Sequence, residues 1–147
     1  MDTFFEISES GNTVRIEPIE FHKYDSDIDW DKNWIKTKIF VKGGHFSGEY
    51  IADIMSIDFE TFKQSFSALY DNLSGVSEFY DLEGYLNLKI KGDGIGHFEM
   101  QVTACDRLGV NASHLHFSMQ FDQTYIKRLS NELNKITEEF PVSGNLN

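Results

Sequence analysis

The chain has only one cysteine, no long apolar run and few basic residues, and each shortage excludes a class of protein. Cys105 alone cannot form a disulfide within the chain, which is typical of proteins from a reducing compartment. No run of about 18 apolar residues occurs, so we expect no membrane-spanning helix. The N-terminus lacks a basic start followed by an apolar run, so no secretory signal is visible. These absences predict a cytoplasmic protein.

The charge balance indicates which partners the protein favours. Lys and Arg together number 13 against 24 Asp and Glu, which gives a formal net charge of -11. Such a field repels nucleic acid and anionic membrane surfaces and attracts basic partners. We therefore expect neither direct nucleic-acid binding nor membrane binding. Solubility alone is the simpler explanation of the acidity, and it stays open.

The length and the aromatic content predict a single folded domain. A chain of 147 residues can bury a hydrophobic core without disulfides or metals, and 13 Phe, 6 Tyr and 2 Trp supply large side chains for it. We assign residues 1–141 to one domain. Residues 142–147, which follow the last periodic segment, are predicted to be a flexible C-terminal tail.

Two segments have the apolar spacing of amphipathic helices. In the first, Asp58 is the predicted cap, apolar residues recur every three or four positions as far as Leu73, and Gly75 is a natural stop. The second begins at Asp122, continues with the same spacing and ends before Pro141.

The remaining segments alternate apolar and polar residues, which is typical of half-buried strands. The alternation is clearest over residues 85–90, 97–104 and 114–121. The first half of the chain is less regular, and its alternation slips at Pro18, which predicts a bulge on an edge strand. The sequence thus predicts an α+β fold, an antiparallel, meander-like sheet of about seven or eight strands with two helices packed on its apolar face.

The segment from Tyr24 to Trp34 has the most unusual composition in the chain. It is not a calcium loop of the EF-hand type, because the required Gly and Glu positions, counted from Asp25, hold Trp30 and Lys36. A solvated loop is the simple interpretation. The functional hypothesis is an acidic patch, edged by aromatic rings, that docks a basic surface. Its candidate partner-binding residues are Asp25, Asp27, Asp29, Trp30, Asp31 and Trp34.

No other pattern indicates catalysis, a metal or a cofactor. The glycines from Gly92 to Gly96 lack the following glycine and helix of a dinucleotide site, so they predict a hairpin turn. His114 and His116, if they point the same way, lie about 7 Å apart, which is wide for two ligands of one zinc ion. Cys105 ends a strand, with no helix N-terminus to activate its thiol. We therefore predict a protein that is not an enzyme and uses neither a metal nor a cofactor.

From Asp29 to Pro141, the order of landmarks resembles the WapI family of bacterial immunity proteins, which are antidotes to the C-terminal toxin of a wall-associated polymorphic toxin. The resemblance includes residues 34–39 (WIKTKI), 44–48 (GHFSG), 83–86 (EGYL), 96–98 (GHF) and 121–125 (FDQTY), together with the helix from Asp58 to Leu73.

This resemblance implies a cytosolic protein, without enzymatic activity, that binds and blocks the C-terminal domain of a toxin delivered by neighbouring cells. It further implies that the toxin is a nuclease acting on RNA. Two other functions stay open. One is a small-ligand or regulatory binding domain, which would need a concave apolar pocket under the sheet. The other is a hydrolase built on a cluster such as His97, Glu99 and His116.

Overall fold

The fold was analysed in a computed structural model of the protein, which describes residues 3–22 and 28–144. Within these residues the chain forms eight strands, two α-helices and two short 3₁₀ helices. In chain order the elements are β1 (Phe5–Glu9), β2 (Asn12–Phe21), η1 (Asp29–Asn33), β3 (Trp34–Gly43), β4 (Phe46–Met55), α1 (Ser56–Asn72), β5 (Ser74–Tyr80), β6 (Leu86–Asp93), β7 (His97–Cys105), β8 (His114–Asp122), η2 (Gln123–Tyr125) and α2 (Ile126–Glu139).

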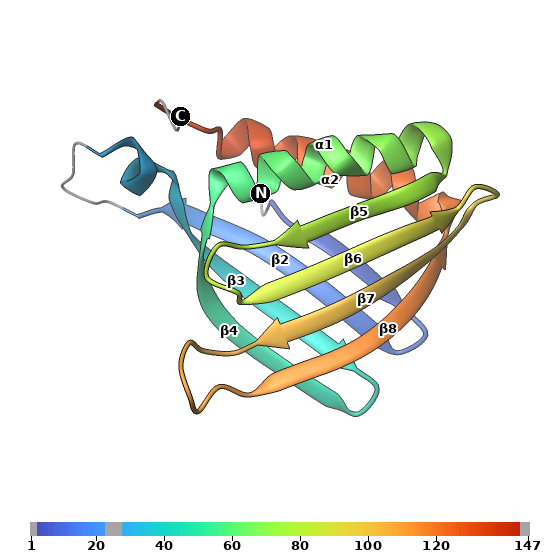
Figure 1. The fold of residues 1–147 in the computed structure, drawn as a ribbon, viewed down its shortest axis with the longest axis horizontal. Coiled ribbons are helices and arrows are strands. Elements are labelled where there is room, and N and C mark those ends of the chain that lie inside the picture. The colour runs from blue at the N-terminus through green and yellow to red at the C-terminus, as the bar shows by residue number, and fades with distance from the viewer. Residues whose placement is uncertain (1–2, 23–27, 145–147) are drawn as a thin grey trace.

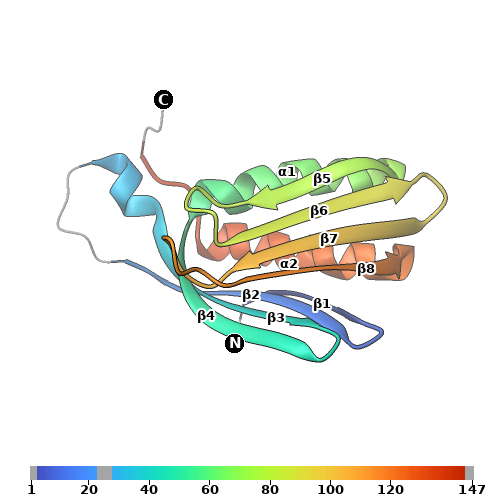
Figure 2. The same cartoon turned by 60° about the horizontal axis from the view of Figure 1, so that its bottom comes forward.

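The strands form two antiparallel sheets of four, each with its strands in chain order. The first sheet is β1-β2-β3-β4 and the second is β5-β6-β7-β8. Both helices lie on the same side of the sheets, where α1 packs along β5 and α2 contacts α1 and β1 (Figures 1 and 2). The predicted class, the antiparallel strands and the two covering helices are confirmed. Division of the strands into two sheets was not predicted.

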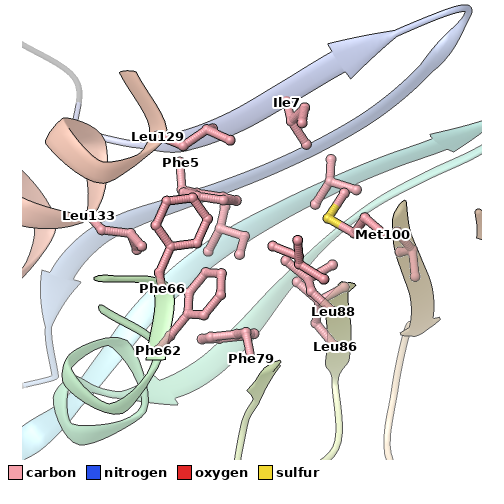
Figure 3. Packing of buried hydrophobic residues seen from close by; sticks show 14 of the residues in the cluster. Phe5, Ile7, Phe62, Phe66, Phe79, Leu86, Leu88, Met100, Leu129 and Leu133 are labelled. Atoms are coloured by element: carbon pink, nitrogen blue, oxygen red, sulfur yellow. The ribbon is translucent and has the colours of Figure 1, made fainter. Parts of the chain in front are cut away.

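One hydrophobic core joins both sheets and both helices. Phe62 of α1 lies at its centre, with ring centroids 5.4 Å from Phe5, 5.8 Å from Phe66 and 5.4 Å from Phe79 (Figure 3). These are edge-to-face contacts, and each contributes about 0.5–1.5 kcal/mol beyond the area it buries. The apolar positions of the strands and helices are therefore buried in a single core.

Several local sequence predictions need correction. Helix α1 begins at Ser56, so its N-cap residue is Met55 and not Asp58. Asp58 lies in the first turn, where its carboxylate accepts the backbone N–H of Met55 in a capping box. The register of β2 with β3 does shift between Pro18 and Glu20, as expected of a bulge, but β2 is an inner strand. Proline fits there because β1 pairs with β2 only as far as Ile16. At Pro18 no strand therefore lies on the β1 side of β2 to accept a hydrogen bond from a backbone N–H, which proline lacks.

The expected glycine turns are present, but α1 ends at Leu73 in a left-handed conformation, and Gly75, the predicted stop, lies in β5. Gly44 and Gly94 have φ of 62° and 88° in the β3–β4 and β6–β7 turns, a conformation that favours glycine. Asp122 caps η2 by accepting the backbone N–H of Thr124. Among the described residues, no helix is both long and apolar enough to cross a membrane.

Candidate partner-binding surface

The acidic, aromatic segment of the sequence hypothesis falls on η1 and the residues that flank it. Four of its six candidate residues are described: Asp29, Trp30 and Asp31 in η1, and Trp34 at the start of β3. The other two, Asp25 and Asp27, lie outside the described residues. Trp30 exposes 44% of its surface, whereas Trp34 is half-buried. Lys32 pairs with the Asp29 carboxylate at 3.3 Å, so the segment is acidic but not uniformly so.

Asn33, which is fully buried, fixes this segment to the rest of the fold. Its side-chain oxygen accepts the hydroxyl of Ser56 at 2.7 Å and the backbone N–H of Ser143 at 2.8 Å. Its amide nitrogen donates to the carbonyls of Asp29 at 2.7 Å and Ser143 at 2.9 Å. The C-terminal segment also passes so close that a side chain at Gly144 would collide with the Asp29 carboxylate. The η1 segment is thus held in place before any partner arrives.

The start of α1 and the β5–β6 turn lie at the same end of the molecule as η1 (Figures 1 and 2). Asp58, in the first turn of α1, accepts the backbone N–H of Met55 at 3.2 Å and also bonds the backbone of Leu82 in the β5–β6 turn. Burial, with a further contribution from the nearby Asp81 carboxylate, raises the pKa of Asp58 to about 6. Asp58 therefore connects the helix to the turn.

Asp81, at 3% exposure, holds the β5–β6 turn in one conformation. Its two oxygens accept the backbone N–H groups of Tyr85 and Leu86 at 3.0 and 2.9 Å, and its carbonyl accepts that of Gly84 at 3.2 Å. All of these bonds are internal to the turn. They leave the side chains on its outer side available for contact with another molecule.

A second acidic region lies at the opposite end of the molecule, where the β1–β2 and β6–β7 turns and the end of β8 meet. It is a hollow of about 630 Å³ whose lining includes four carboxylates, from Glu9, Asp93, Glu99 and Asp122. The Asp93 carboxylate accepts hydrogen bonds within the turn, and these lower its pKa, with the largest effect from the Ile95 N–H. The His97 ring nitrogen lies 3.0 Å from the same carboxylate. Sequence reasoning missed this hollow because its residues converge from distant parts of the chain.

The residues expected of a hydrolase or metal site are not brought together. His97 and Glu99 share one end of β7, but His116 pairs with Thr103, six residues further along the strand, or roughly 20 Å away. The rings of His114 and His116 stack at 6.3 Å, and within residues 3–22 and 28–144 no group of three potential ligands could hold a metal ion. The Cys105 thiol donates to the carbonyl of Arg107.

An apolar groove of about 280 Å³ between β4 and β8 is the feature closest to the pocket that a small-ligand domain would need. Its lining includes Tyr50 and Leu115, with Phe46 at the rim. The Tyr50 hydroxyl donates to the carbonyl of Tyr85 at 2.7 Å, and burial raises its pKa. Phe46 exposes 72% of its surface, so the groove is open to solvent instead of enclosing a ligand.

Fold and surface together define a class: an acidic α+β domain of two four-stranded antiparallel sheets and two helices, with carboxylates gathered at both of its ends. The chain belongs to the Immunity protein WapI-like family, whose model matches residues 4–141. This membership indicates a toxin-neutralising immunity role.

Comparison with other proteins adds information on the fold alone. No curated protein matches the chain. WHY1 from Arabidopsis thaliana is similar in structure, with a TM-score of 0.54 and 12% identity over 95% of this chain and 91% of that one. MRP1/MRP2 of Trypanosoma bruciei give a TM-score of 0.52 and 11% identity over 95% of this chain and 86% of theirs.

Proposed function

We propose that this protein is a non-enzymatic, cytoplasmic immunity protein that binds the C-terminal domain of a cognate toxin and blocks its activity. The observation that carries the proposal is the family match over residues 4–141. The proposed toxin is a basic nuclease that acts on RNA. The immunity protein itself binds neither nucleic acid nor membrane, since a net charge of -11 repels both.

The acidic surface would act on the toxin in two ways. Its field steers the protein onto the basic cleft that a nuclease needs for its substrate, and its carboxylates then take the place of substrate phosphates. The proposed contact residues are those of the sequence hypothesis: Asp25, Asp27, Asp29, Trp30, Asp31 and Trp34. Support comes from η1, which carries three of them on a short helix fixed by the hydrogen bonds of Asn33.

Co-expression with the cognate toxin domain, to be sought among the genes adjacent to this one, tests the immunity role. Cells that produce the active toxin domain should survive when this protein is present and die without it. Loss of RNA in the unprotected cells would identify the toxin as an RNase. Death of cells that contain both folded proteins would contradict the immunity role.

The proposed surface is tested by replacing Asp25, Asp27, Asp29 and Asp31 together with Asn. Because the charges act mainly during diffusional encounter, association with the toxin should slow several-fold and depend less on salt. The matched control replaces Asp71, Asp93, Glu99 and Asp122 with their amides, which removes the same charge from the opposite end. Equal slowing by both variants would assign steering to the overall charge and not to the η1 segment.

A further inference from the structure

The β5–β6 turn exposes two large side chains to solvent. Tyr80 exposes 64% of its surface at the end of β5, and Leu82 exposes 68% in the turn that follows. Solvent exposure of a single apolar side chain is common, but here two occur within three residues on a backbone already fixed by Asp81. A rigid turn loses little conformational freedom on binding, so its exposed side chains are suited to contact a partner.

A small hollow lies directly beside Tyr80 on the outer face of the second sheet. Its volume is about 240 Å³, and its lining includes Tyr80, Glu78, Asn87 and Thr103. The amide of Asn87 donates to the Glu78 carboxylate at 3.1 Å, which holds that carboxylate at the wall of the hollow. An aromatic ring beside a fixed carboxylate is a suitable site for the side chain of one Lys or Arg.

The charge around the turn indicates the same kind of partner. The chain has no Lys or Arg from Gln64 to Leu88, whereas Glu78, Asp81 and Glu83 all fall in this stretch. One positive charge lies nearby, on Lys89, which is opposite Glu78 on β6, so carboxylates still outnumber basic groups around the turn. Asp58, at the start of α1, adds a further carboxylate next to the turn. A basic surface therefore fits here, and an acidic one is repelled.

We propose that the β5–β6 turn is a second docking site for the toxin domain, separate from the η1 segment. The hollow takes one Lys or Arg of the toxin, which lies against the Tyr80 ring and pairs with Glu78. Leu82 inserts among apolar side chains of the toxin next to that cation. This inference rests on the proposed immunity function. The charges of the η1 segment speed the formation of the complex, and the contacts of the turn slow its dissociation.

The test measures binding of the purified toxin domain, the one that this protein neutralises in the co-expression experiment, to variants of the turn. The double variant Leu82→Ser and Tyr80→Thr should weaken binding by at least about 10-fold, mainly through faster dissociation. Glu78→Gln keeps the size of the side chain and its bond from Asn87, and it should weaken binding less while reducing its salt dependence. Ile95→Ser is the matched control, because Ile95 exposes 77% of its surface on a turn at the opposite end.

The outcomes separate this inference from the function on which it rests. If the turn variants bind the toxin as tightly as the wild type, the second docking site is wrong and the immunity role stands. If Ile95→Ser weakens binding as much as the turn variants do, the effect is not specific to the turn and the inference is again wrong. If the wild type does not bind the toxin domain, both proposals fail. Thermal unfolding of each variant confirms that it is folded before binding is compared.

Discussion

At the scale of single residues, Asp58 makes the stability of the protein depend on pH. Its folded-state pKa is about 6 against an ordinary value of 3.8, chiefly because burial disfavours its charged form. A group whose pKa is raised by folding stabilises the fold while it is protonated. Its contribution is therefore fully present below about pH 3.8 and is lost as the pH rises through about 6.

We predict that Asp58→Asn stabilises the protein at pH 7.5 relative to the wild type. The carboxylate is partly exposed, and its charge also favours the helix N-terminus, so the expected gain is about 1 kcal/mol instead of the full value of the shift. The gain should disappear near pH 3.5, where the wild-type carboxyl is protonated as well. Urea unfolding at the two pH values measures it, and a gain that is the same at both would contradict the assignment to Asp58.

Sequence reasoning at this scale found the residues but not their surroundings. Asp58 was correctly placed at the start of a helix, because a carboxylate before an amphipathic segment is a local signal. Its contact with the β5–β6 turn and the burial of Asp81 depend on residues more than 20 positions away, which no local pattern encodes. The same reason explains why Asn33, an ordinary residue in an acidic segment, could not be predicted as the fixed point of η1.

At the scale of elements, the end of α1 is packed tightly onto β6 through Gly92. The helix ends at Leu73, which has a left-handed φ of 58°, and its carbonyl accepts the N–H of Gly94 at 2.7 Å. A Cβ on Gly92 would lie 2.5 Å from that carbonyl oxygen and 2.9 Å from the Phe98 ring. Backbone atoms cannot move aside as a side chain can, so the helix end and the strand would have to separate.

Gly92→Ala should therefore lower the free energy of unfolding by about 1–3 kcal/mol, the usual cost of an overpacked site. Gly48→Ala is the matched control, because a Cβ there meets nothing within 4 Å. Alanine also restricts the unfolded chain more than glycine does, so Gly48→Ala should be neutral or slightly stabilising. Urea unfolding compares the two, and equal stability of both variants would show that α1 does not pack on β6 in this way.

Strands and helices were the part of the fold that the sequence predicted best. Alternation over residues such as Leu86, Leu88 and Ile90 reports which face is buried, and three- and four-residue spacing does the same for helices. The boundary between two sheets has no such signal. Strands β4 and β5 follow the same rules as their neighbours, and only the intervening helix, α1, separates them into different sheets.

At the scale of the whole molecule, the fold places acidic regions at two opposite ends. The η1 segment and the β5–β6 turn share one end, where the start of α1 lies between them, and the carboxylate-lined hollow lies at the other (Figure 1). Negative charge could be read from composition, but its location could not. The acidic loop before Trp34 was visible only because its residues are consecutive, whereas those of the turn and the hollow meet through folding.

If the η1 segment and the β5–β6 turn contact the toxin as separate sites, their effects on binding should add. We predict that combining the four Asp→Asn changes with Leu82→Ser and Tyr80→Thr gives a free-energy loss within about 0.5 kcal/mol of the sum of the two losses. The charges should act on association and the turn on dissociation, so the rate constants of the combined variant should show both changes. A combined loss no greater than that of one variant alone would mean that the two segments form a single coupled contact.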